Sequence, residues 1–190
     1  MLTIKPRFET FEEYLLYEDY SEKLYELFNG ELIEVPPESG FNIEIANHLF
    51  LFFALRLGSD RVRGHGLELE VRGEPKNRYP DLTILREEHI QQLSKRNTIR
   101  LNMAPPLVVM EIVSPGEIQR DRDYIAKRIQ YQDCCISEYW IIDPQNQTIL
   151  ILELVENSYR NFGEFKGDDL LRSPTFGQLE LRIIDILSAN

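Results

Sequence analysis

The sequence is poor in cysteine and lacks any long hydrophobic run. Its only two cysteines, Cys134 and Cys135, are adjacent, which provides neither a disulfide framework nor the spacing of a zinc site. The longest uninterrupted apolar run, residues 49–55, is far shorter than the roughly 20 residues of a membrane-spanning helix. No charged segment followed by an apolar stretch opens the chain, so we expect a cytoplasmic protein without membrane contact.

Basic residues are outnumbered by acidic ones, with 21 Lys and Arg against 32 Asp and Glu, so the formal net charge is −11. By itself this charge disfavours a nucleic-acid partner. The charge is distributed unevenly, however, with −8 over residues 1–55, +3 over residues 56–128 and −6 over residues 129–190. The basic excess therefore lies in the middle of the chain. The acidic residues at the two ends could belong to a metal site or to a face turned away from a substrate. A solvated acidic surface without a partner explains them equally well.

With 190 residues, of which 43% are hydrophobic, the chain is long enough for one domain with a real core. Residues 8–28 predict an acidic amphipathic helix and then the start of a strand. Asn29-Gly30 separates two apolar runs and predicts a hairpin that pairs roughly residues 24–28 with 31–35. Residues 41–57 have helical periodicity, which Gly58 ends.

The remaining elements alternate between strands and helices. Strands are predicted near residues 62–71, 79–85, 107–113, 137–144 and 148–155, a long loop or short helix at 86–104, a helix at 119–134, and a strand with a short closing helix in the tail. This order predicts an α/β domain with a mixed central β-sheet flanked by helices. We divide it into an N-terminal helix and hairpin (1–40), an αβββαβ core (41–155) and a C-terminal closing segment (156–190).

The segment LVVMEIVSP, residues 107–115, is the most informative stretch. It is short, rich in β-branched residues and bounded by Pro106 and Pro115, which predicts a buried strand. A single carboxylate, Glu111, interrupts it. Burying that group costs several kcal/mol unless something compensates its charge. Glu111 must therefore have a cationic or hydrogen-bonding partner, or hold a metal.

Two other residues are suitable partners for Glu111. Asp81 follows Pro80 at the start of a strand, and Lys127 shares a helix face with Tyr124 and Tyr131, which points it toward the sheet. Each also has an ordinary explanation: Asp81 as a turn residue, Glu111 as a salt-bridged core residue and Lys127 as a snorkelling side chain. Together, two carboxylates and an ammonium suit metal-assisted phosphodiester hydrolysis.

Several segments resemble one known family. YPDLTIL, LVVMEIVSP, RDRDYIAKRIQYQ and EYWIIDP are similar, in content and order, to the Uma-type (DUF820) family of putative restriction endonucleases in the PD-(D/E)XK nuclease superfamily. The resemblance covers roughly residues 20–185. It implies a restriction-endonuclease-like core, DNA cleavage, and Mg²⁺ as cofactor, with Mn²⁺ as a substitute.

The resemblance also implies roles for individual residues. Asp81 and Glu111 would be the acidic pair, with the carbonyl of Ile112 as third metal ligand. The superfamily's lysine would stand at Val113 here, so the resemblance implies that its role has moved to Lys127.

Three further acids are weighed as supporting residues. Glu31 matches an acidic position in the family but is equally well an exposed hairpin residue. Glu44 belongs to the first long helix, which often contributes an acid in this superfamily. Asp121 lies at the start of a predicted helix, where a role as N-terminal cap or dipole partner explains it as well as a catalytic role does. We expect Tyr139 and Trp140 to be core or rim aromatics, and the three scattered histidines to have no catalytic role.

A DNA substrate requires local positive charge, and two-strand cleavage by so small a chain would favour a homodimer. The residues expected to line a basic groove are Arg78, Lys95, Arg96, Arg100, Arg120 and Arg128.

Two alternatives remain open. One is a catalytically inactive nuclease-like fold acting as a protein-interaction or assembly module, and the other is an Asp–Lys–Glu cluster that only stabilises the core.

Overall fold

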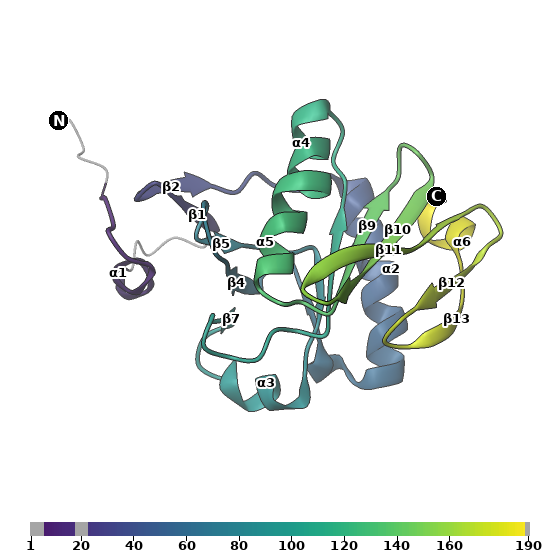
Figure 1. Ribbon diagram of the computed structural model, residues 1–190, viewed down its shortest axis with the longest axis horizontal. Helices are drawn as coiled ribbons and strands as arrows, with labels where there is room; N and C mark the ends of the chain where they lie inside the picture. The colour runs from purple at the N-terminus through teal and green to yellow at the C-terminus, as the bar shows by residue number, and fades with distance from the viewer. Residues whose placement is uncertain (1–5, 18–22, 189–190) are drawn as a thin grey trace.

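The computed structural model describes residues 6–17 and 23–188. Its centre is a six-stranded sheet with the strand order β11-β10-β9-β8-β6-β3 (Figure 1). The strands are β3 (Val62–Gly64), β6 (Leu82–Ile84), β8 (Val108–Ile112), β9 (Glu138–Asp143), β10 (Thr148–Val155) and β11 (Ser158–Lys166). Only β8 and β9 pair in parallel, and the other neighbours are antiparallel. The predicted mixed α/β architecture is therefore confirmed.

Helices cover both faces of this sheet (Figure 1). The helices of the described residues are α1 (Phe11–Leu16), α2 (Gly40–Leu57), α3 (Glu87–Gln92), α4 (Glu117–Asp121), α5 (Arg128–Asp133) and α6 (Ile183–Leu187), with a 3-10 turn at Ser59–Arg61 and a π-helical segment, η2, at Arg122–Lys127. Of these, α2 lies on one face of the sheet and α5 on the other, while α1 lies beside the hairpin of residues 25–34. Ser39 caps α2, since its Oγ accepts a hydrogen bond from the backbone N–H of Asn42. Gly58 ends that helix at φ +92°, a backbone conformation that glycine adopts without strain.

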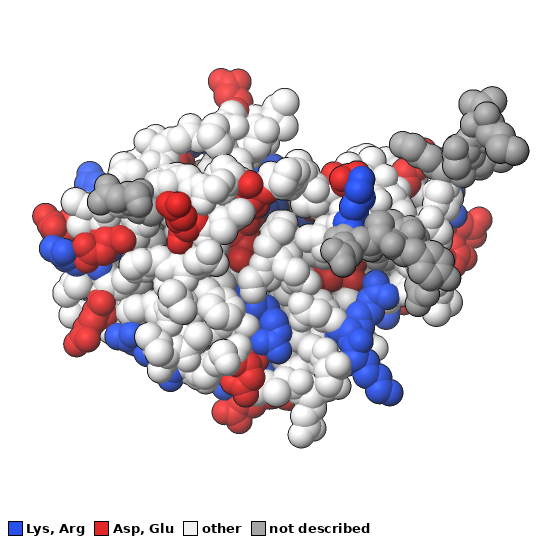
Figure 2. Space-filling view, turned by 180° about the vertical axis from the view of Figure 1, so that it is seen from behind, with Lys and Arg blue, Asp and Glu red and all other residues white. Residues whose placement is uncertain are grey.

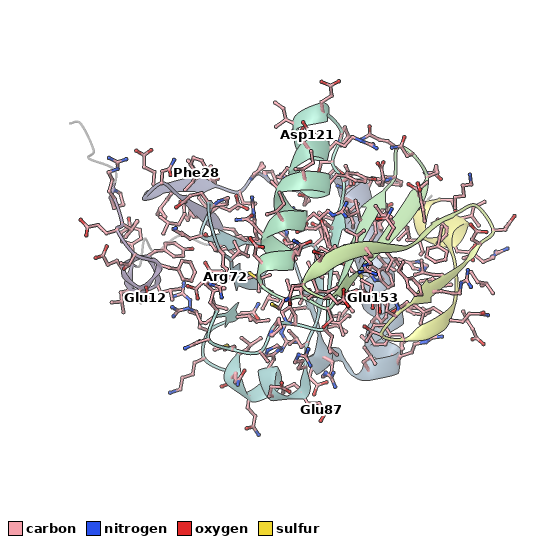
Figure 3. All side chains as sticks on the ribbon, viewed as in Figure 1. Glu12, Phe28, Arg72, Glu87, Asp121 and Glu153 are labelled. Atoms are coloured by element: carbon pink, nitrogen blue, oxygen red, sulfur yellow. The ribbon has the colours of Figure 1, made fainter. Side chains whose placement is uncertain are left out.

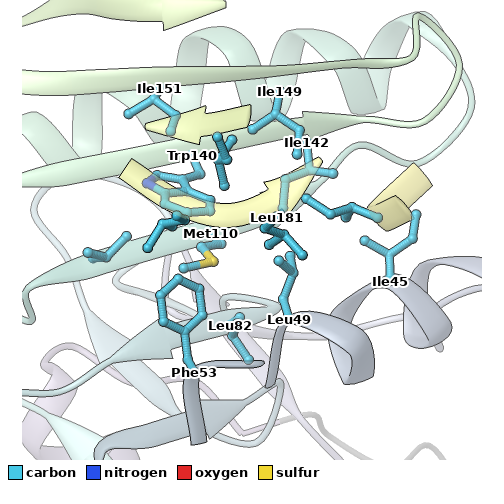
Figure 4. Close-up of a cluster of buried hydrophobic side chains, with 14 of the residues drawn as sticks. Ile45, Leu49, Phe53, Leu82, Met110, Trp140, Ile142, Ile149, Ile151 and Leu181 are labelled. Atoms are coloured by element: carbon cyan, nitrogen blue, oxygen red, sulfur yellow. The ribbon is translucent and has the colours of Figure 1, made fainter. Parts of the chain in front are cut away.

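Alternation along the strands sends successive side chains into two cores. Met110 belongs to the core beneath α2, together with Leu49, Phe53 and Trp140 (Figure 4). Val109 and Tyr131 belong to the second core, beneath α5. Glu111 follows Met110, so its side chain points to the α5 side of the sheet.

Smaller sheets surround this centre: a β1–β2 hairpin, a three-stranded sheet in the order β5-β4-β7 and a β12–β13 pair. Their strands are β1 (Tyr25–Phe28), β2 (Glu31–Glu34), β4 (Glu68–Glu70), β5 (Asn77–Arg78), β7 (Thr98–Ile99), β12 (Leu170–Ser173) and β13 (Gly177–Arg182). The predicted hairpin is confirmed, because Tyr25 pairs with Glu34 and Phe28 with Glu31 around Asn29-Gly30.

Other sequence-based predictions need correction. The helix predicted after residue 8 covers only Phe11–Leu16, and part of that prediction, residues 18–22, lies outside the described residues. The strand predicted at 62–71 is two strands in different sheets. Residues 156–190, which we set apart from the core as a closing segment, contribute the strand β11, which pairs with β10 in the central sheet. No helix within the described residues has the length and apolar character needed to cross a membrane.

Candidate active site

The antiparallel register of β6 and β8 brings Asp81 and Glu111 together. Leu82 pairs with Met110, so Asp81, one residue earlier, lies beside Glu111, one residue later. Both carboxylates are buried, with 6% of Asp81 and 1% of Glu111 exposed. They line one small cleft of about 30 Å³ together with Lys127. The two acids therefore face the same side of the sheet and share one space.

Asp81 is fixed by the neighbouring strand. Its Oδ2 accepts a 2.7 Å hydrogen bond from the backbone N–H of Ile112. Its Oδ1 lies 3.6 Å from Nδ1 of His65, a buried nitrogen that makes no hydrogen bond among the described residues. Burial, and then the nearby charge of Glu111, raise the pKa of Asp81 well above its ordinary value. A cation bound between the two acids would favour the ionised form of Asp81 and so oppose this rise in pKa.

Lys127 supplies the cationic partner that the position of Glu111 required. Its Nζ lies 2.7 Å from Oε2 of Glu111, and Tyr131 donates its hydroxyl to Oε1 of the same carboxylate. Burial acts to lower the pKa of Lys127, but the carboxylates of Glu111 and Asp123 outweigh it, and the pKa is raised. Lys127 is therefore a charged, buried lysine rather than a side chain extended into solvent.

Asp123 is the residue that sequence reasoning missed. Its Oδ1 lies 2.9 Å from Lys127 Nζ, and its side chain is fully buried. The guanidinium of Arg122 also donates to this carboxylate, from Nε to the same Oδ1 at 3.1 Å and from Nη2 to Oδ2 at 3.4 Å. Asp123 and Lys127 are four residues apart, a spacing that places them on one helix face and could have identified the pair. Both belong to η2, and π-helical segments often occur at functional sites.

The three supporting acids do not reach this cleft. Glu31 is exposed on the hairpin and pairs with Arg7 at 3.2 Å. Glu44 is exposed on α2, and Asp121 is exposed on α4 (Figure 3). The acids that do line the cleft, besides Asp81 and Glu111, are Glu26 and Glu38. Glu38 comes from the loop before α2, a position that periodicity did not identify.

The described residues contain no group of three or more His, Cys, Asp or Glu side chains arranged to hold a metal. The set expected from the sequence is Asp81, Glu111 and the carbonyl oxygen of Ile112. The two carboxylates line the cleft, whereas that carbonyl accepts a 3.4 Å hydrogen bond from Asn42 Nδ2. These hard oxygen donors fit Mg²⁺, which retains several waters and usually takes only one or two carboxylates from the protein. The raised pKa of Asp81 fits a site that a cation completes.

Most of the residues expected to line a basic groove are engaged in ion pairs or hydrogen bonds. Arg78 is buried and pairs with Glu26 at 3.0 Å, so it is not placed to contact DNA. Arg96 donates to the carbonyl of Leu15, while Arg100 pairs with Glu12 of α1.

The other three expected groove residues lie elsewhere. Arg120 pairs with Asp143 at 2.9 Å, Arg128 donates to the carbonyl of Tyr159, and Lys95 is exposed. On the face shown in Figure 2, the Lys and Arg side chains of the described residues are dispersed among acids and do not form a single patch. The expectation of one pre-formed basic groove is therefore not met on this face.

Comparison with known proteins identifies the family. A family model for Uma2, described as putative restriction endonuclease, matches residues 11–184. The chain belongs to the Uma2 family. Among solved structures, the Uma2 chain resembles a protein from Anabaena variabilis ATCC 29413 described as a putative nuclease belonging to DUF820. The TM-score is 0.66 at 19% identity, covering 93% of this chain and 96% of that one, which establishes a shared fold. No curated protein matches the chain.

Proposed function

We propose that this Uma2 protein is a metal-dependent endonuclease that hydrolyses DNA phosphodiester bonds at Asp81, Glu111 and Lys127. The observation that carries the proposal is the shared cleft, which two buried acids and one buried lysine line together. Family membership supports a nucleic-acid substrate. The proposal extends this to DNA, to Mg²⁺ or Mn²⁺, and to these three side chains.

The ligands of the cation would be Asp81, Glu111 and the carbonyl oxygen of Ile112. A bound divalent cation supplies Lewis-acid polarisation of the phosphate. The chain's own contribution is orientation: the backbone N–H of Ile112 fixes Oδ2 of Asp81, and Tyr131 fixes Oε1 of Glu111. Both carboxylates are thereby positioned before substrate arrives, which reduces the reorganisation required on binding.

Lys127 would stabilise the charge that grows on the phosphate in the transition state. An ammonium group has three N–H donors. Contacts with Glu111 and Asp123 account for two of them, at 2.7 and 2.9 Å. The third donor is left for a phosphate oxygen or for the attacking water. Cleavage of both strands of a duplex would then require two subunits, for which a homodimer is the simplest arrangement.

A plasmid-nicking assay tests the proposal directly. The wild-type chain should convert supercoiled DNA to the nicked form with Mg²⁺ or Mn²⁺ and not with EDTA. Asp81→Asn and Glu111→Gln should remove the activity while unfolding cooperatively as the wild type does. Full activity of Glu111→Gln would exclude the proposed chemistry, and a stable but inactive wild-type protein would favour the interaction-module alternative.

A further inference from the structure

A second pocket, of about 200 Å³, lies directly beside the candidate active site. It is lined by α2 and by the end of the sheet at β3 and β6. Glu38, His65 and Asp81 line both this pocket and the Asp81–Glu111 cleft. A group bound in the pocket would therefore be adjacent to whatever the acidic pair holds.

The walls of the pocket are mostly apolar. Ala46 and Phe50 are four residues apart on α2 and so present neighbouring side chains, and Leu82 of β6 also lines the space. The ring of His65 adds a second flat surface. Phe50 and His65 thus provide aromatic surfaces of the kind on which a planar ring stacks.

The rim of the pocket is polar and uncharged on its α2 side. Asn47 is exposed and lines the pocket, so its amide is placed to donate and accept hydrogen bonds. Asn42, which also lines the space, already donates to Glu38 and Ser114. Two carboxylates in the lining, Glu38 and Asp81, disfavour an anion, so the pocket does not suit a phosphate group.

We propose that this pocket binds the nucleobase of the nucleotide adjacent to the phosphate held at Asp81 and Glu111. The inference rests on the proposed nuclease function. A nucleobase is neutral and planar, with an edge that an asparagine amide can bind. A base inside a duplex stack cannot enter such a pocket, so the substrate must present an unpaired or flipped nucleotide at the cleavage position. Single-stranded DNA, or a duplex with an unpaired base, is therefore the preferred substrate class.

The experiment measures occupation of the pocket separately from cleavage. A single-stranded oligonucleotide carrying 2-aminopurine is titrated in the presence of Mg²⁺ with the Lys127→Gln protein, which keeps both proposed carboxylate ligands of the cation, and the base fluorescence reports its environment. Ile43→Trp places a large side chain at a half-exposed position that lines the pocket. Leu51→Trp adds the same bulk to a more exposed position of α2 away from the pocket and is the matched control.

We expect the fluorescence change to be retained in the Leu51→Trp protein and binding to weaken about tenfold in the Ile43→Trp protein. If Ile43→Trp fails to fold, Asn47→Ala becomes the test variant and His48→Ala its control. Both residues are exposed on α2, but only Asn47 lines the pocket. Equal binding by the variant and its control would overturn the proposal, as would faster cleavage by the wild type of fully paired DNA than of single strands.

These results separate the two proposals. A fluorescence change that Ile43→Trp abolishes, combined with a wild-type protein that cuts no DNA, would leave the nucleobase pocket standing and refute the nuclease function. Cleavage that is insensitive to Ile43→Trp on every substrate would refute the pocket and leave the nuclease function standing.

Discussion

Nζ of Lys127 lies 2.7 Å from Oε2 of Glu111, although the two residues are 16 positions apart and belong to a helical segment and a strand. The ion pair explains how a carboxylate is tolerated in the apolar strand β8. It also places a cation at the cleft that Asp81 lines. Experiments can separate the contribution of this ion pair to folding stability from its contribution to catalysis.

Asp81→Asn should stabilise the metal-free protein at neutral pH while abolishing cleavage. The folded-state pKa of Asp81 is raised, so the folded chain binds this proton more tightly than the unfolded chain does. The wild type therefore loses stability as pH rises from the unfolded value of about 3.9 through the folded-state pKa. Asparagine resembles the protonated acid and avoids that loss.

Thermal unfolding with EDTA at several pH values checks the effect of Asp81→Asn. A tenfold difference in proton affinity between the folded and unfolded chains corresponds to about 1.4 kcal/mol of stability, and each kcal/mol to about 2–4 °C in Tm for a chain of this size. The stability advantage of Asp81→Asn over the wild type should shrink as the pH is lowered toward about 4. A variant that is less stable than the wild type at neutral pH would contradict the prediction.

Asp123→Asn should reduce the cleavage rate at saturating DNA, because Lys127 loses one of its two anionic contacts. Misplacement of a catalytic group by about 1 Å costs roughly 10²-fold in rate. Asp121→Asn, two residues away and exposed, is the matched control and should behave as the wild type. The assay compares kcat and KM, and the loss should fall on kcat. Equal rates for the two variants would show that Asp123 does not position the lysine.

Mg²⁺ should raise the thermal stability of the wild type but not of the Glu111→Gln variant. A ligand that binds only the folded state adds about 2.7 kcal/mol at a concentration of 100 times Kd. Differential scanning fluorimetry with a millimolar series of Mg²⁺ or Mn²⁺ measures the shift. A wild type whose Tm is unchanged by either metal would favour the third interpretation, a buried ion cluster that serves only the core.

Glu138→Ala should destabilise the fold without removing a group that lines the cleft. Glu138 is fully buried, and it accepts hydrogen bonds from the indole N–H of Trp140, the hydroxyl of Ser173 and the backbone N–H of Thr175. Losing them leaves buried donors unsatisfied, at about 1–3 kcal/mol each. Urea unfolding measures the loss. Cleavage per folded molecule at low temperature should stay near the wild-type rate, and an inactive but folded variant would contradict this role.

Local sequence signals identified much of the fold. Asn29-Gly30 specified the hairpin, the apolar periodicity and Gly58 specified α2, and the β-branched run specified β8. The same local signals failed where contacts with other segments of the chain decide the structure. Residues 62–71 look like one strand, but Gly64 and Gly66 divide them between two sheets. The strand β11 lacks a clean alternation of buried and exposed residues, and its pairing with β10 contains a register shift.

The sequence by itself determined that Glu111 needs a partner, because an apolar strand cannot hold a bare carboxylate, and it indicated Asp81 and Lys127 as the groups nearest in chemistry. Only the tertiary structure decided the rest. The antiparallel register of β6 and β8 sets the acids side by side, and the packing of η2 against the sheet brings Lys127 to Glu111. The sequence pattern suggests that Arg78 is a surface cation, but its burial against Glu26 depends on contacts 52 residues apart, which no local pattern contains.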